Sequence, residues 1–464
     1  MDVIFNRIKE KTSFLCEYEN KKENILLIGH VQSGKTIELL AYCWWSIFVL
    51  KTSVIVFVRN FKIDITQLVE RICIFNQTIV IDSAFFLEIH NEESEQLIKQ
   101  VGKQVGKQVD KQVVFIRLQN HIQATKMLKI IREKNLRYHL CIDEADYAVK
   151  STKNISKFEC YMKYIEKGSS HTLVATATPF AVLAVKKEIT KVLRLTEPKD
   201  YKNLEMVNKK FVHVNFPISQ VPHEDPNLDI IYPQFLKKKH GIMFHLVTRK
   251  KGFQMCIMEK LASMFKKLTV LVYNGDGAFI QTNDNHRLNY NGINYSIKQS
   301  TNGRFCHWIR KIQLNKVLQI LKEDTVKHNH IVIIGGNMIS RGVSVVSEDY
   351  KWHLTDQYFH PSKSSHGENI IQSLRILGKY NDNLSLTLWC TPDTWNDILE
   401  QMEINKKIDK YSGSSRKIDI KKPNRNPTRK GVMQNVKFES NNKNGKDMLT
   451  LADIEDTVYS DEEQ

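Results

Sequence analysis

The sequence predicts an α/β protein with two tandem domains, each built on a parallel sheet, and a C-terminal tail without a core. A chain of 464 residues is too long for one ordinary core and fits two domains of roughly 150 to 200 residues. Short β-branched runs alternate with helical stretches in both halves, which is the pattern of a parallel sheet covered by helices. After Met402 the apolar periodicity fades into a Lys/Arg/Asn-rich stretch and then an acidic one.

The first half of the chain begins with a strand, a loop and a helix. Asn24–Ile28 is a short apolar run, and a glycine-containing loop separates it from a helical stretch at 36–49. Ser53–Val58 (SVIVFV) lacks polar alternation, as expected for a parallel strand covered on both faces. We therefore expect the first domain at 1–200, with further strands at 113–116, 140–142 and 172–175.

The apolar stretch 39–58 is the one membrane candidate. Lys51 splits it, and the first part is too short to cross a bilayer, so we expect a buried helix followed by a buried strand and no membrane partner. The charged N-terminus has no signal-peptide pattern. The eight cysteines show no C-x-x-C pair and no Cys/His spacing suited to zinc, so we expect free thiols in a reducing, intracellular compartment, cytoplasmic or nuclear.

The second half repeats the α/β pattern. An irregular, proline-containing segment predicts an interdomain linker at 201–240. The second domain is expected at 241–402, with a long loop at 276–301 that is rich in Asn, Gly and Tyr. We expect residues 403–464 to form a disordered tail, because they cannot bury enough apolar surface.

Composition adds two expectations about partners and origin. A net charge of +17 favours a polyanionic partner, nucleic acid before membrane. The repeat at 99–112 (KQVGKQVGKQVDKQ) is a low-complexity expansion, expected in a surface loop or a frayed helix. This repeat and the abundant Lys, Asn and Ile are typical of an AT-rich genome, such as that of a large DNA virus.

The segment 29–36 (GHVQSGKT) matches the P-loop pattern in full and lies between a predicted strand and a predicted helix. Its glycines let backbone N–H groups wrap a phosphate, and the helix N-terminus adds partial positive charge. Lys35 would reach the β- and γ-phosphates, and the Thr36 hydroxyl would ligate Mg²⁺. We therefore expect ATP and Mg²⁺, with the nucleotide held by Gly29, Gln32, Ser33, Gly34, Lys35 and Thr36.

A second acidic element follows the predicted strand at 140–142, which ends in Asp143, Glu144, Ala145 and Asp146. A carboxylate at the carboxyl end of such a strand points toward the ligand-binding edge of the sheet. Asp143 can hold Mg²⁺ through a water, and Glu144 can orient and deprotonate the attacking water. An isolated acidic quartet is a solvated turn, but with a P-loop upstream it predicts a Walker B motif.

The segment 175–179 (ATATP) ends another predicted buried strand. Its hydroxyls could bridge the acids of the magnesium site to the other domain, or the segment could be a small-residue turn that caps the strand.

The order of these motifs resembles that of superfamily-two helicases, and most closely the ATPases of the endonuclease-associated Z-one type. Four elements carry the resemblance: VQSGKT, DEAD, TATPFA and GGNMISRG, at 31–36, 143–146, 176–181 and 335–342. They occur in the family's order over about three quarters of the chain. The resemblance implies two tandem RecA-like domains that bind one ATP between them.

The resemblance also implies that GGNMISRG contacts both nucleotide and nucleic-acid backbone. Glycines allow close approach of the backbone, and Arg341 offers a planar donor fork for phosphate. The alternative for Arg341 is a salt bridge to a carboxylate of the first domain.

The last family motif is altered in this chain. Gln372, Arg375 and Gly378 fit its Q-x-x-R-x-x-G core, but the arginine expected just beyond the glycine is missing, and Lys379 and Tyr380 stand there. Arg375 is therefore the candidate arginine finger. Lysine does not fully replace a bidentate arginine, so we expect turnover to be slow or dependent on a partner.

These observations predict an ATP hydrolase that is a helicase or a translocase acting on nucleic acid. Among nucleic acids we expect DNA rather than RNA, although the motifs do not separate the two. Two alternatives stay open: an ATP-binding switch that holds nucleic acid with little motor activity, and an ATPase partner of a separate nuclease chain. No nuclease motif is visible outside the predicted ATP site.

Overall fold

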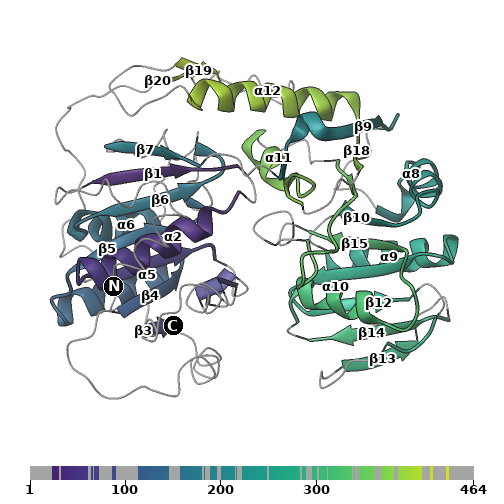
Figure 1. Ribbon diagram of the computed structural model, residues 1–464, viewed down its shortest axis with the longest axis horizontal. Helices are drawn as coiled ribbons and strands as arrows, with labels where there is room; N and C mark the ends of the chain where they lie inside the picture. The colour runs from purple at the N-terminus through teal and green to yellow at the C-terminus, as the bar shows by residue number, and fades with distance from the viewer. Residues whose placement is uncertain are drawn as a thin grey trace.

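The computed structural model contains two large β-sheets, which Figure 1 shows side by side, and two small two-stranded sheets, β17-β8 and β19-β20. It describes residues 23–409 with gaps, the longest of which are 73–85, 90–112 and 146–156, and also 419–421 and 435–437. The repeat at 99–112 and most of the expected tail lie outside the described residues.

The first sheet has seven strands, all paired in parallel, in the order β3-β4-β2-β5-β6-β1-β7. Its apolar strands bury both faces, one core cluster forming around α2 and another beside α5 and α6. The elements are β1 (Asn24–Ile28), α2 (Lys35–Trp44), β2 (Ser53–Val58), β3 (Phe86–Ile89), β4 (Val113–Leu118), α5 (His121–Glu133), β5 (Tyr138–Ile142), α6 (Lys157–Gly168), β6 (Thr172–Thr176) and β7 (Lys191–Arg194).

The apolar stretch 39–58 folds as predicted, as a buried helix followed by a buried strand. Helix α2 continues into a π-helical turn, Trp45–Val49, before β2. Trp44 and Trp45 are buried in the core of the first sheet. In the part of the chain that the structure describes, no helix is long and apolar enough to span a bilayer.

The second sheet has nine strands, in the order β13-β14-β12-β11-β15-β10-β16-β18-β9. Strands from β11 to β9 pair in parallel, whereas β12, β14 and β13 extend the sheet in antiparallel fashion. The strands are β9 (Val207–Phe211), β10 (Gly241–Leu246), β11 (Thr269–Asn274), β12 (Gly277–Gln281), β13 (Tyr295–Gln299), β14 (Phe305–Ile309), β15 (His330–Gly335), β16 (Asp356–Tyr358) and β18 (Leu386–Cys390). The helices are α8 (Leu228–Phe235), α9 (Lys251–Met264), α10 (Leu314–Glu323), α11 (Gly367–Ser373) and α12 (Pro392–Asp409).

The expectation of one long loop at 276–301 is wrong. This segment contributes β12 and β13, which pair with β11 and β14. Ala278 and Ile280 are fully buried in the sheet's core, and Gly277 has a φ of 122°, which suits the tight turn from β11. The segment was interpreted as a loop because it is rich in Asn and Gly, but the residues of β12 that face the core are apolar.

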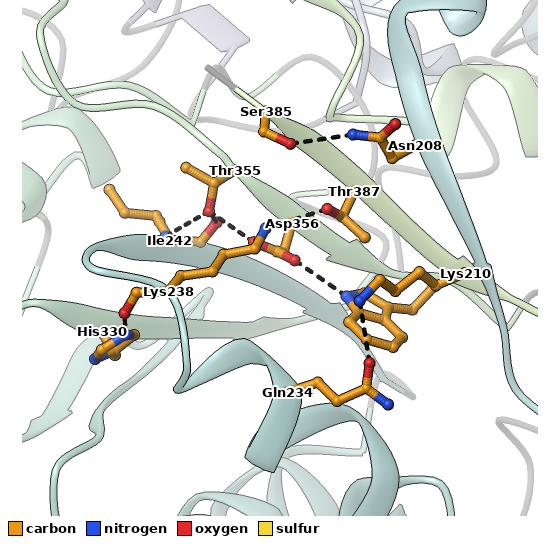
Figure 2. Close-up of polar contacts among 11 residues, drawn as sticks. Asn208, Lys210, Gln234, Lys238, Ile242, His330, Thr355, Asp356, Ser385 and Thr387 are labelled. Carbon is orange, nitrogen blue, oxygen red and sulfur yellow. Dashed lines mark hydrogen bonds and ion pairs between the residues drawn. The ribbon is translucent and has the colours of Figure 1, made fainter.

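The segment expected to link the domains, 201–240, supplies elements to the second sheet. Strand β9 is its edge strand, and α8 packs into its core. Figure 2 shows the polar contacts that anchor this segment: Lys238 Nζ lies 2.6 Å from Oδ2 of the fully buried Asp356, and Lys210 Nζ lies 3.1 Å from Gln234 Oε1. The indole Nε1 of Trp389 donates to Asp356 Oδ1 at 3.1 Å. Asp356 therefore has partners on both oxygens.

Helix α12 lies across the top of both sheets in Figure 1. Ile398 belongs to the core of the second sheet, whereas Ile404 belongs to a core cluster of the first. The helix therefore ties the two sheets together, and it runs past Met402, where the tail was expected to begin.

Candidate nucleotide site between the two sheets

The P-loop joins β1 to α2 at the carboxyl edge of the first sheet. Gly29 N donates to Thr176 O at 3.3 Å, so the loop leaves the sheet beside the end of β6. Gly34 precedes α2 with a φ of 98°, and no side chain caps the helix N-terminus. A Cβ at Gly29 would lie 2.6 Å from Ser33 Oγ and 2.9 Å from Lys35 Cγ, so a larger residue there would displace both side chains. The first N–H groups of α2 are therefore available to a phosphate.

Lys35 is buried and folds back over the loop. Its Nζ donates to Gly29 O at 3.1 Å and to His30 O at 3.0 Å. The predicted contact Gln32 lies outside the described residues. Ser33 Oγ is buried, and its backbone N–H donates to His30 O at 3.2 Å. Lys35 Nζ and the Ser33 N–H therefore share the His30 carbonyl oxygen as acceptor.

Asp143 and Glu144 follow β5, within electrostatic reach of the P-loop. Burial and the neighbouring Glu144 raise the pKa of Asp143 to about 6, although Lys35 pulls it down. Glu144 has a φ of 48°, in the left-handed region, and its N–H donates to Asp143 Oδ1 at 3.1 Å. A strained, non-glycine backbone at a carboxylate is common at functional sites.

Two arginines that the sequence did not single out also lie here. Arg59, directly after β2, donates through Nε and Nη2 to both carboxylate oxygens of Asp64, at 2.9 and 2.7 Å. Arg71 Nη1 donates to Thr36 Oγ1 at 2.8 Å and attracts Asp143. The sequence position of Arg59, directly after a buried strand at the carboxyl edge of the sheet, could have predicted it as a site residue. Arg71 could not have been predicted, because it reaches the site from a segment that has no motif.

The second sheet touches the first through the last motif. Gln372 Nε2 donates to Thr178 Oγ1 at 2.6 Å, and both side chains are buried. Ala177, of the same TATP segment, belongs to the core cluster of the second sheet. The Thr178 N–H also donates to Thr176 Oγ1 at 3.0 Å, so the segment forms a local turn at the end of β6 as well as a contact with the second sheet.

Arg375 lies just beyond α11 and is also buried. Its Nη2 donates to Val343 O at 2.9 Å, which fixes the guanidinium on its own domain. Burial lowers the pKa of Arg375 to about 10, and attraction by Glu144 opposes that shift. Arg375 and Glu144 come from different sheets, so this attraction places the finger candidate within electrostatic reach of the Walker B acid.

Tyr380 fills a core position instead of facing phosphate. Its hydroxyl donates to Ile376 O at 2.6 Å, and its ring packs edge-on against His353. The short strand β17 (Gly378–Lys379) pairs with β8 (Tyr201–Lys202), which ties this motif to the segment between the sheets. The Tyr201 ring also contacts the P-loop ring of His30. The predicted phosphate contact Arg341 lies outside the described residues.

No family model and no curated protein matches the chain. Among solved structures, the DEAD-box helicase Mss116, bound to ssRNA and UDP-BeF, aligns with a TM-score of 0.50 at 12% identity, covering 88% of this chain and 75% of that one. S. cerevisiae Dbp5 bound to RNA and ADP-BeF3 aligns with a TM-score of 0.49 at 14% identity, covering 87% and 90%. The DUF1998 helicase MrfA, bound to DNA and AMPPNP, gives 0.46 at 12% identity, covering 84% and 49%.

The fold is that of two tandem RecA-like domains. At 12–14% identity, the similarity to these structures extends only to the fold. Conclusions about function therefore depend on the residues of the site.

The donor set at the carboxyl edge fits Mg²⁺. A threonine hydroxyl and two adjacent carboxylates are hard oxygen ligands of the kind that Mg²⁺ prefers. The raised pKa of Asp143 shows that its negative charge is poorly compensated by the protein alone. A divalent cation would supply the missing compensation.

Proposed function

We propose that this protein is an ATP-dependent nucleic-acid helicase or translocase that hydrolyses ATP between its two RecA-like domains. The observation that carries the proposal is the buried contact between Gln372 and Thr178, which joins the last motif of the second sheet to the first sheet. Beside it, Arg375 and Glu144 attract each other from opposite domains. The last motif of the second sheet therefore lies against the first sheet.

Each site residue has a distinct role in this proposal. The N-terminus of α2 and Lys35 bind the β- and γ-phosphates of the substrate. Thr36 and Asp143 hold Mg²⁺, which when bound neutralises charge on the phosphates. Glu144 orients the attacking water and accepts its proton, and Arg375 offsets charge that develops on the γ-phosphate.

The nucleic-acid partner rests on the net charge of +17 and on the motif order. We propose DNA as the preferred strand and the Z-one type as the closest branch, on the strength of VQSGKT, DEAD, TATPFA and GGNMISRG. Mss116 and Dbp5 are bound to RNA and MrfA to DNA, so both nucleic acids belong in the test.

A second candidate function is a slow, ATP-bound switch, with or without a nuclease partner chain. One observation favours it: Tyr380, which stands beside the missing arginine, is committed to the core. A site with one arginine finger in place of two would hold ATP for longer between turnovers.

Phosphate release with single- and double-stranded DNA and RNA tests the proposal. We expect at least one nucleic acid to stimulate hydrolysis by the wild type. Lys35→Ala should lose both nucleotide binding and turnover, because it removes a phosphate ligand, whereas Glu144→Gln should bind ATP and fail to hydrolyse it. Wild-type turnover by Glu144→Gln would refute the assignment of the acid, and ATP binding without stimulated release would favour the switch.

A further inference from the structure

A cluster of two histidines and one aspartate lies in the second domain, outside the nucleotide site. His286 follows β12, Asp324 caps the C-terminus of α10, and His328 precedes β15. One ligand atom of each side chain lies within 4.8 Å of the other two. In the part of the chain that the structure describes, these three residues are the one His/Cys/Asp/Glu group with such spacing.

The three ligand atoms converge on a nearly closed interior point. The side chains of His328 and Asp324 are 0% and 3% exposed, and that of His286 is 19% exposed. Asp324 Oδ2 lies 2.7 Å from His328 Nε2 and also contacts His286 Nε2. The two rings are nearly parallel, with an interplanar angle of 26°. Only the His286 side is open to solvent, which gives an ion a way in.

The outward atoms of His328 and Asp324 are held by the protein. His328 Nδ1 lies 2.8 Å from Thr269 Oγ1 on β11, and Asp324 Oδ1 accepts the Thr325 N–H at 2.9 Å. His307 Nε2 on β14 lies 3.1 Å from the backbone oxygen of His286. Metal-binding histidines are oriented in this way, because the partner on one ring nitrogen aims the other nitrogen at the ion.

Two imidazole nitrogens and one carboxylate oxygen form a donor set that suits Zn²⁺. We propose that His286, Asp324 and His328 bind one Zn²⁺ ion. Three protein ligands leave a fourth tetrahedral position, which water fills on the exposed side of His286.

The position of the cluster points to a structural ion. Strand β15 runs from His330, beside the cluster, to Gly335, where the GGNMISRG motif begins, so about 17 Å of strand separates the ion from the nucleotide side. The ligands join the segment after β12 to the connection between α10 and β15. Zinc would therefore pin the antiparallel extension, β12, β14 and β13, to the parallel part of the sheet.

The test uses full-length protein made without a polyhistidine tag, stripped with EDTA, dialysed and titrated with Zn²⁺ alone. We expect one zinc per chain by mass spectrometry. With free zinc near 100 times the dissociation constant, the melting temperature of the second domain should rise by about 5–10 °C. Cobalt bound in place of zinc should give visible absorption bands.

Three variants make the test specific. His286→Asn and Asp324→Asn should each lose stoichiometric zinc and the thermal shift; His286 is partly exposed, so its variant keeps the fold. His330→Asn is the matched control, because this buried histidine lies two residues from His328 and its Nε2 contacts Lys238 O instead of the cluster. It should keep one zinc.

The proposal is overturned if wild-type protein binds less than about a tenth of an equivalent, or if His286→Asn keeps its zinc. The three side chains would then form a hydrogen-bonded network only. Metal content is measured without ATP or nucleic acid, so this outcome is independent of the proposed ATPase.

Discussion

At Asp143, burial and the adjacent Glu144 both disfavour the charged carboxylate, and they outweigh the attraction of Lys35 and Arg71. The pKa therefore rises from 3.8 to about 6 on folding. For an acid whose pKa is raised, ionisation in the folded state costs stability above pH 6, and the cost vanishes below about pH 4. The ionised Asp143 carboxylate therefore destabilises the folded protein unless a cation binds beside it.

We expect Asp143→Asn to raise the melting temperature at pH 8 without Mg²⁺, because the uncompensated charge is gone. The gain should shrink as pH falls from 6 to 4, while Mg²⁺-dependent turnover is lost at every pH. Thermal scans across this range measure the first effect, with the exposed Asp229→Asn as control. A lower melting temperature for Asp143→Asn at pH 8 would mean that the carboxylate is stabilising instead.

The site residues that sequence patterns could predict are those with local signatures. Lys35 and Asp143 each follow a strand within a recognisable motif, so strand position alone places them at the carboxyl edge. Arg71 and His286 depend on packing between segments far apart in sequence: 35 residues separate Arg71 from Thr36, and 38 separate His286 from Asp324. Sequence periodicity does not reveal contacts between such distant segments, and spacing rules for zinc sites that depend on cysteine do not detect a cluster without cysteine.

At the scale of elements, strands with continuous apolar runs were predictable, and those with mixed composition were not. Val207–Phe211 (VNKKF) has a polar sequence because β9 is an edge strand with exposed residues, so the segment was interpreted as linker. The segment 201–240 is held to the second sheet by the ion pair between Lys238 and Asp356 (Figure 2). These residues are 118 positions apart, so the sequence alone does not predict the pair.

We expect Lys238→Met to destabilise the second domain by about 3–5 kcal/mol, because it leaves Asp356 buried without its cation. The double variant Lys238→Met/Asp356→Asn should recover most of that loss, since it removes both charges and keeps the Oδ1 acceptor of Trp389 Nε1. Urea denaturation of the single and double variants gives the free energies of unfolding. If the double variant is less stable than Lys238→Met, the pair is not what anchors this segment.

At the scale of the whole molecule, α12 couples the domains, because Ile398 and Ile404 enter different cores. We expect truncation after Asp409 to keep the melting temperature and basal hydrolysis. Truncation after Met402 should lower the melting temperature, since it removes Ile404.

The same truncation after Asp409 tests the basic tail. If the lysines and arginines of the tail bind phosphates, removing them should flatten the slope of log affinity against log salt on duplex DNA. The expected change is about 0.9 for each phosphate that the tail neutralises. Identical slopes for full-length and truncated protein would show that the tail does not touch nucleic acid.

The central claim is that residues of both RecA-like domains act on one ATP. The most direct measurement is turnover by Arg375→Ala, beside Lys379→Ala, with nucleotide affinity and melting temperature recorded for each. The account predicts that Arg375→Ala remains folded, binds nucleotide nearly as well as the wild type, and hydrolyses it about 10³ to 10⁵ times more slowly. A wild-type rate for both Arg375→Ala and Lys379→Ala would contradict the claim, whereas a loss for Lys379→Ala alone would move the finger role to Lys379.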